Sequence, residues 1–177
     1  RDLLASDGLL RPRTLSNYDV DFENPIARAG HGARHDVVRA TFNGDACVLK
    51  IFKGLCANER QRRRFVREGS MLARLAHPSI ARVNAVFIDH AGGDACIEMP
   101  QYGGTLDQWL VDASPSSEDK HRVLTLILRG IEHLHSNGVV HADIKPANIL
   151  MSTMDADAVP CISDFDLSLS SDERCQL

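Results

Sequence analysis

Residues 141–150 read HADIKPANIL, and this stretch decides the fold class. It places a carboxylate (Asp143), an ammonium group (Lys145) and a carboxamide (Asn148) at fixed offsets behind a histidine. A second acidic motif begins at Asp164, sixteen residues after Asn148. Phosphoryl transfer requires a group that orients the attacking hydroxyl, a cation beside the phosphate, and oxygen ligands for a metal ion. The two motifs, in this order and spacing, predict that chemistry.

The composition indicates a folded protein and argues against several partners. Hydrophobic residues make up 44% and charged residues 25% of the 177 residues, which is enough for a packed core. A net charge of -4 gives no support to the binding of nucleic acid or acidic membranes. No apolar run approaches the roughly 20 residues of a membrane helix. The chain begins with Arg1 and shows no signal-peptide pattern, so we expect a piece of a longer protein or a processed product.

The five cysteines lack CxxC spacing, which argues against a zinc site and against a disulfide framework. Reduced, buried thiols in an intracellular, cytoplasmic protein are the simpler interpretation. His133 and His135 are two residues apart and point to different sides of a helix, so we expect structural roles for them.

The first half of the chain has the pattern of a small sheet with one helix. Residues 1–21 lack a period and are interpreted as an irregular leader. Residues 25–52 are β-prone and contain the hairpin signal Asn43-Gly44, so three antiparallel strands are expected there. Helical spacing of apolar residues predicts a helix over 58–75, whose crowded arginines indicate a solvated face more than a phosphate site. Two further strands are expected at 83–88 and 95–99.

The second half has a mostly helical pattern. Gly103-Gly104 breaks the chain, and Thr105 fits the N-cap of a short helix that ends at Leu110. A long helix is expected over 121–136, and its broad apolar surface predicts burial on most sides. Short strands are expected at 149–150 and 161–162.

With these motifs in order, the chain resembles the eukaryotic protein kinases from about residue 25 to residue 169. The resemblance implies an α+β, two-lobed fold, with a five-stranded antiparallel N-lobe sheet, one main helix, and a partial, mostly helical C-lobe. It implies ATP and Mg²⁺ as cofactors, and a protein substrate with serine or threonine. The implied domains are the irregular leader at 1–21, the N-lobe at 22–99, a hinge at 100–104 and the partial C-lobe at 105–177.

Gly30 and Gly32 begin a segment that resembles the family's phosphate-covering loop, where glycine lets the backbone approach phosphate oxygens. Taken alone, two such glycines would indicate only a turn. Val37 follows where the family covers the adenine ring. His35 replaces the family's third glycine, and this departure is expected to stiffen the loop or weaken nucleotide binding.

Residues 48–50 resemble the strand that carries the family's lysine, so Lys50 is implied to hold the α- and β-phosphates. Glu68, eighteen residues later, matches its ion-pair partner. Residues 97–104 resemble the hinge between the lobes. The implied nucleotide contacts are Val48, Met99, Gln101, Tyr102 and Leu150.

In the opening motif, the resemblance makes Asp143 the residue that orients the substrate hydroxyl, and Lys145 the residue that stabilises the transferring phosphate. Asn148 and Asp164 are implied to bind magnesium. A lysine two residues after the aspartate is the pattern of serine/threonine-directed members. In the family, the residues matching His141 and Phe165 pack rather than react.

Three departures from the family are expected to have consequences. Ala142 stands where many relatives carry an arginine that receives a phosphorylated activation loop, so that switch should be absent. Asp166 replaces a glycine, and its charge would either repel nucleotide or recruit a cation. Beyond Leu169 the sequence lacks the family's later helices, so part of the helix at 121–136 is expected to be uncovered.

Three hypotheses about function stay open. The first is a serine/threonine kinase domain whose catalytic set is Asp143, Lys145, Lys50 and Glu68. The second is a pseudokinase-like module that binds nucleotide or a partner without catalysis. The third, a small-molecule phosphotransferase of related fold, is less consistent with the spacing from Lys145 to Asn148.

Overall fold

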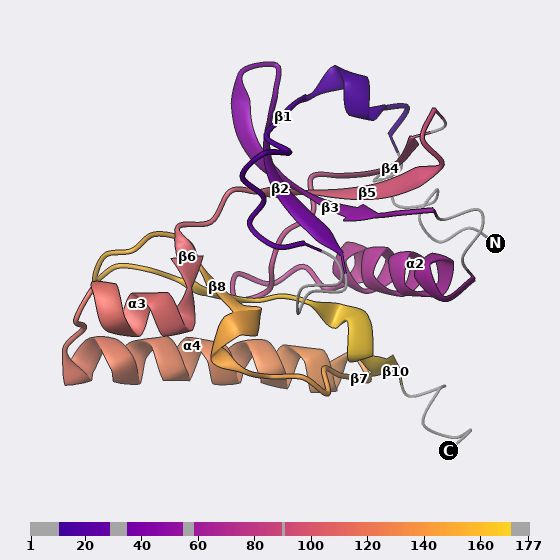
Figure 1. The fold of residues 1–177 in the computed structure, drawn as a ribbon. Coiled ribbons are helices and arrows are strands. Elements are labelled where there is room, and N and C mark those ends of the chain that lie inside the picture. The colour runs from indigo at the N-terminus through magenta and orange to yellow at the C-terminus, as the bar shows by residue number, and fades with distance from the viewer. Residues whose placement is uncertain (1–10, 29–34, 55–58, 90, 171–177) are drawn as a thin grey trace. The chain divides into compact units, whose positions relative to one another are not determined.

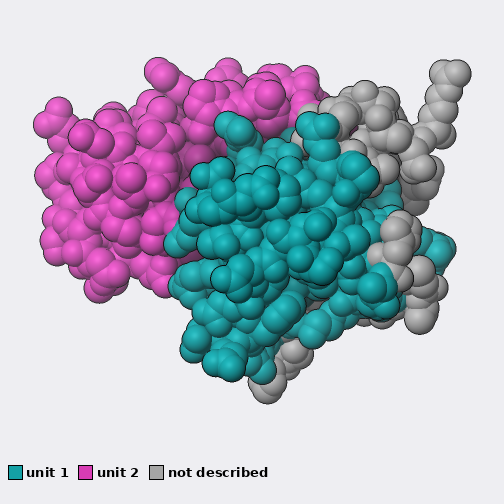
Figure 2. All heavy atoms as spheres, turned by 90° about the horizontal axis from the view of Figure 1, so that it is seen from above, with its two compact units in different colours: residues 1–73, 82–101 teal, residues 74–81, 102–177 magenta. Residues whose placement is uncertain are grey.

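The computed structural model describes residues 11–28, 35–54, 59–89 and 91–170, which fold into two compact units (Figures 1 and 2). The first unit comprises residues 1–73 and 82–101, and the second comprises 74–81 and 102–177. The sequence interpretation assigned 74–81 to the N-lobe. These residues group with the second unit because Ile80 forms a parallel bridge with Ile162.

The first unit is built on a five-stranded antiparallel sheet, as the fold-class prediction states. Its hairpin turns at Asn43 and Gly44, whose φ angles of 54° and 91° suit these two residue types. The strands in spatial order are β1 (Asp19–Val20), β2 (Asp36–Phe42), β3 (Asp45–Phe52), β5 (Asp94–Pro100) and β4 (Ala85–Asp89).

Helix α2 (Glu59–Arg74) is the helix expected from the apolar spacing. Its residues Phe65, Met71 and Leu72 are buried. The Phe65 ring meets the Phe52 ring edge-on, with centroids 5.4 Å apart. The helix therefore covers the face of the sheet to which Phe52 belongs (Figure 1).

The interpretation of residues 1–21 as an irregular leader is wrong for residues 15–20, while residues 1–10 lie outside the described part. Leu15–Asn17 form a 3₁₀ turn, and β1 pairs with Ala40 and Thr41 of β2. Around residue 25, where a strand was expected, Ala27 forms only an isolated bridge with Val37. Residues 15–20 are ordered because the Tyr18 ring, 8% exposed, stacks on the Phe87 ring with centroids 5.3 Å apart.

The second unit is mainly helical, with short strands. Helix α4 begins at Ser117, four residues before the expected start, because Ser116 and Asp119 form a reciprocal N-cap. Asp119 N donates to Ser116 Oγ at 3.1 Å, and Ser116 N donates to Asp119 Oδ2 at 3.0 Å.

The elements of the second unit are α3 (Leu106–Asp112), α4 (Ser117–Ser136), a three-stranded sheet of β6 (Gly104–Thr105), β8 (Ile149–Met151) and β9 (Pro160–Ile162), and a pair of β7 (Val139–Val140) with β10 (Leu169–Ser170).

Helix α4 has one buried face and one exposed apolar face. Val123 and Ile127 join Trp109 in the core of this unit. Leu124 and Leu128, one helical turn apart, are 54% and 55% exposed, so part of this helix surface is uncovered. Within the described residues, no helix combines the length and apolarity needed to cross a lipid bilayer.

Residues 77–81 pack closely against α4 and β9. Ile162 N donates to Ser79 O at 2.9 Å, and Ala81 N donates to Ile162 O at 2.8 Å. A Cβ atom added at Gly130 of α4 would lie 3.1 Å from Ser79 O and 3.0 Å from Ile162 Cδ1. Because Ser79 O is held by a hydrogen bond, a side chain at residue 130 would have to push this backbone away by a few tenths of an ångström.

Gly130→Ala is expected to lower the free energy of unfolding by about 1–2 kcal/mol, because crowding against Ser79 outweighs the better helix propensity of alanine. Urea unfolding checks this value. The control is Leu128→Ala on the exposed face of α4, for which a change within about 0.5 kcal/mol is expected. A Gly130→Ala protein as stable as the control would contradict the close approach.

Candidate active site

Lys50 and Glu68 form a buried ion pair in the first unit. Lys50 Nζ lies 2.9 Å from Glu68 Oε1 and 2.7 Å from Oε2. Lys50 is 7% exposed and Glu68 is 1% exposed. Side chains alternate across a strand, so Lys50 of β3 shares the α2-facing side of the sheet with Phe52.

This ion pair holds an ammonium group at a fixed place in the first unit. Removing one partner of a buried pair costs about 3–5 kcal/mol, because it leaves an uncompensated buried charge. The pair itself is weak evidence for added stability, since both charges lose their hydration. Its clearer consequence is position: Glu68 orients the end of the Lys50 side chain.

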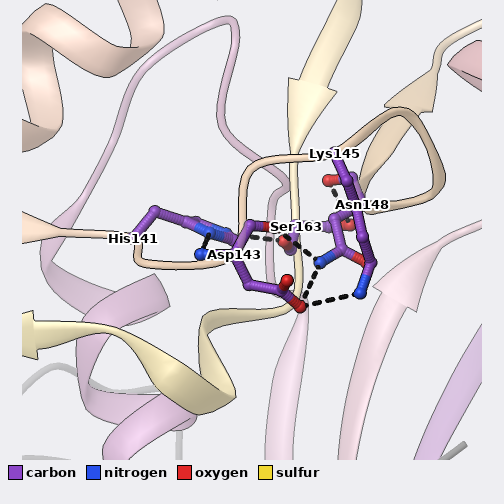
Figure 3. Close-up of polar contacts among 5 residues, drawn as sticks. All are labelled: His141, Asp143, Lys145, Asn148 and Ser163. Atoms are coloured by element: carbon purple, nitrogen blue, oxygen red, sulfur yellow. Dashed lines mark hydrogen bonds and ion pairs between the residues drawn. The ribbon is translucent and has the colours of Figure 1, made fainter.

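In the second unit, Asp143, Lys145 and Asn148 come together in one loop (Figure 3). Asp143 Oδ2 accepts from Lys145 Nζ at 2.8 Å and from Asn148 Nδ2 at 3.0 Å. Asn148 Nδ2 also donates to Asp143 O at 2.9 Å. The Asn148 carboxamide is buried and fixed through its nitrogen, which leaves its oxygen as the atom that can bind a cation.

Ser163 joins this loop to the end of β9, and sequence reasoning missed it. Its backbone N and its hydroxyl both donate to Asn148 O, at 2.9 and 3.0 Å. These two bonds tie the residue before Asp164 to Asn148. Its small polar side chain at the end of a strand, directly before Asp164, is the signal that could have found it.

His141 is a buried connector between the same two segments. Its Nε2 donates to Ser163 O at 2.8 Å, and its Nδ1 accepts from Asp143 N at 3.3 Å. Its ring meets the Phe165 ring edge-on at 4.9 Å. Burial lowers the pKa of His141, because desolvation disfavours the imidazolium form. The neutral ring therefore orients the chain that carries Asp143.

Asp164 and Ala142 are the strained backbone positions near this loop. Each has a φ of 63°, in the left-handed region that costs most non-glycine residues about 1–2 kcal/mol. Asp166 lies in the 3₁₀ turn Phe165–Leu167, is 3% exposed, and is not among the positive-φ residues. The backbone here therefore does not require the glycine that Asp166 replaces.

The remaining expected site residues are distributed over both units. In the first unit, Val37 lies opposite Lys50 in the β2–β3 register, and Val48 lies opposite Met99 in the β3–β5 register. Gln101 is exposed at the end of this unit. In the second unit, Tyr102 and Leu150 are half-buried. The expected phosphate-loop residues Gly30 and Gly32 lie outside the described residues.

His35, which replaces the family's third glycine, is 4% exposed, and its ring lies 4.1 Å from the Phe52 ring. The substitution therefore adds a packing contact inside the first unit. It extends the buried aromatic group that Phe52 and Phe65 begin.

The sequence profile of the protein kinase domain matches residues 25–175. The chain belongs to the protein kinase family. It is 35% identical over 158 residues to the Xenopus laevis serine/threonine-protein kinase mos, covering 83% of this chain and 43% of that protein. It is 32% identical over 157 residues to human calcium/calmodulin-dependent protein kinase type IV, covering 86% of this chain and 32% of that protein. The chain thus spans less than half the length of these kinases.

The donor set of the second unit fits the magnesium ion that protein kinases use. Mg²⁺ prefers oxygen ligands, and Asn148 and Asp164 offer a carboxamide oxygen and a carboxylate. The Asn148 side-chain nitrogen already donates to Asp143, so the side-chain oxygen is the atom that remains for a cation. The chemistry of the residues present therefore agrees with a magnesium site.

The pKa of His141 predicts an acid-sensitive fold. Its folded-state pKa lies below the ordinary value of 6.5, so the unfolded state binds its proton first as the pH falls. The stabilising contribution is complete above about pH 6.5 and is lost as the pH drops through the folded-state value. Urea unfolding at pH 7.5 and 5.5 should show a larger loss of stability for the unchanged protein than for His141→Asn.

His77 serves as an internal comparison, because burial and the stacked His133 ring lower its pKa in the same direction. A His77→Asn protein should keep the part of the acid sensitivity that belongs to His141. Equal pH dependence in the unchanged protein and in His141→Asn would contradict the assignment of His141 as a buried neutral ring.

Proposed function

We propose that the protein to which this chain belongs is a serine/threonine kinase that transfers the γ-phosphate of ATP to a protein hydroxyl with the help of Mg²⁺. The observation that carries the proposal is that Lys145 and Asn148 both donate to one carboxylate oxygen of Asp143. The buried Lys50–Glu68 pair supports it from the first unit. A lysine two residues after Asp143, and the names of the similar kinases, favour serine and threonine as acceptors.

In this proposal Asp143 orients the acceptor hydroxyl and takes its proton. Hydrogen bonds from Lys145 and Asn148 hold its carboxylate in place. Lys145 is half exposed, and its ammonium group ends a flexible four-carbon side chain, so it can also contact the transferring phosphate. Position and charge are the main means by which proteins catalyse phosphoryl transfer.

Lys50 would contact the nucleotide phosphates, with Glu68 holding its ammonium group. Met99, Gln101 and Tyr102 would contact the adenine, together with Val37, Val48 and Leu150. Asn148 and Asp164 would hold magnesium, which supplies positive charge to the phosphate oxygens when bound. Gly30 and Gly32 complete the proposed nucleotide-binding set.

The same proposal places the protein in the cytoplasm, with ATP and a serine- or threonine-containing protein as partners and with no nucleic acid. Among the described residues, Cys47, Cys96 and Cys161 are free and buried. Burial raises the pKa of Cys47 to about 11 and that of Cys96 to about 12, so both stay protonated thiols. Unpaired cysteines of this kind are typical of a reducing compartment.

Lys50→Met and Asp164→Asn should each lower the rate of phosphate transfer by about 100-fold or more, because each removes a charge that acts on the phosphates. The measurement is transfer of labelled γ-phosphate to a serine peptide, a threonine peptide and a tyrosine peptide. The whole protein should be used, since the chain spans less than half of the similar kinases. Transfer to serine and threonine but not to tyrosine is expected.

The matched controls are Lys53→Met and Asp157→Asn. Lys53 directly follows β3, is 62% exposed and pairs with Asp36 of β2, and Asp157 lies in an exposed loop. Both control variants should transfer phosphate at the rate of the unchanged protein. Unaltered transfer by Lys50→Met or Asp164→Asn would defeat the proposal. Magnesium-dependent stabilisation by ATP without any transfer would favour the pseudokinase alternative.

A further inference from the structure

Residues 11–20 form a segment that we call the N-terminal strap. The strap precedes residues 25–175, which match the protein kinase domain, yet it contributes to the core of the first unit. Tyr18 packs in one cluster with Leu49 and Ile51 of β3, while Leu15 and Val20 pack against that cluster. Because Lys50 and Phe52 point to α2, the strap covers the opposite face of the sheet (Figure 1).

The strap is also joined to the sheet by polar contacts. Arg11 N donates to Val86 O at 2.9 Å, and Leu15 N donates to Asp89 Oδ1 at 3.3 Å. These contacts fix the strap along β4. They leave the side chains of Arg13 and Tyr18 beside β5, where they meet Glu98.

Glu98 is a buried carboxylate whose negative charge is compensated by residues of the strap. It is 5% exposed. Arg13 forms an ion pair with Glu98 Oε2, and the Tyr18 hydroxyl donates to the same oxygen at 2.6 Å. Arg13 Nη1 also donates to the Tyr18 oxygen at 3.0 Å, which closes a triangle of three contacts. The Arg13 guanidinium also lies 3.8 Å from the centre of the Phe42 ring, which adds a cation–π contact to its contacts with Glu98 and Tyr18.

The triangle keeps its donors in one protonation state. Burial and the hydrogen bond to Glu98 raise the pKa of Tyr18, so its hydroxyl remains a donor at neutral pH. A buried carboxylate that loses one of these partners would be left incompletely compensated. The strand that carries it would then shift to bring Glu98 toward water.

Glu98 directly precedes Met99, and β5 ends at Pro100. We infer that Arg13 and Tyr18 are positioning residues for nucleotide binding, because their contacts with Glu98 fix the strand end that presents Met99 and Gln101. The inference rests on the proposed function, in which Met99 and Gln101 contact the adenine. It assigns a role in ATP affinity to a segment outside the matched kinase domain.

Two variants of the strap separate positioning from general stability. Tyr18→Phe removes the hydroxyl that binds Glu98 but keeps the ring that stacks on Phe87. Leu15→Ala removes apolar packing against the same core and leaves the Glu98 contacts in place. In the whole protein, Tyr18→Phe should weaken binding of Mg²⁺-ATP by about threefold to tenfold. Leu15→Ala should lower the melting temperature and keep the dissociation constant within twofold. A twofold change corresponds to about 0.5 kcal/mol of binding free energy.

Hydrogen exchange without nucleotide provides a second measurement. Tyr18→Phe should speed exchange of the amides of Ile97, Glu98 and Met99, whereas Leu15→Ala should leave these amides unchanged. Arg13→Lys, which keeps the charge, should fall between the unchanged protein and Arg13→Met in both measurements. Proportional changes of affinity and melting temperature in all strap variants would overturn the inference, since they would indicate a purely structural role.

The inference and the proposed function fail in different ways. An unchanged protein that does not bind Mg²⁺-ATP would defeat the proposed function and the affinity claim together. An unchanged protein that binds Mg²⁺-ATP, with a Tyr18→Phe variant of equal affinity and equal amide exchange, would overturn the inference alone.

Discussion

Strand β3 is buried on both of its faces, and this constraint organises the first unit. Cys47, Leu49 and Ile51 face the cluster that includes Tyr18, whereas Lys50 and Phe52 face α2. Because side chains alternate along a strand, a shift of one residue would send Lys50 to the wrong face. The strap and the helix α2 therefore hold the same register from opposite sides, and that register gives Glu68 its partner.

The second unit depends on a different device, a set of hydrogen bonds between two chain segments. Ser163 donates twice to Asn148 O, and His141 donates to Ser163 O. These bonds hold the loop of Asp143 and Asn148 against the segment that enters Asp164. The cost is local strain, since Ala142 and Asp164 both adopt a φ of 63°. Strained residues are expected beside a candidate catalytic loop, where the position of a side chain matters more than a low-energy backbone conformation.

Much of the fold follows from local signals. The pair Asn43-Gly44 predicts the β2–β3 turn because both residues tolerate positive φ. Helix α2 follows from apolar spacing, and the two residues that donate to Asp143 Oδ2, Lys145 and Asn148, lie two and five positions after it. The start of α4 was misjudged, because the reciprocal N-cap of Ser116 and Asp119 begins this helix four residues before the expected position.

The sequence by itself determined the family and most of the elements and predicted the proposed catalytic set, because these depend on residue type and short spacing. Only the tertiary structure decided that residues 15–20 belong to the sheet, since Tyr18 finds Glu98 eighty positions away and Phe87 nearly as far. It also decided that residues 74–81 join the second unit, through Ile162. Such pairings are set by burial of apolar surface and compensation of buried charge between distant segments, which no short window of sequence contains.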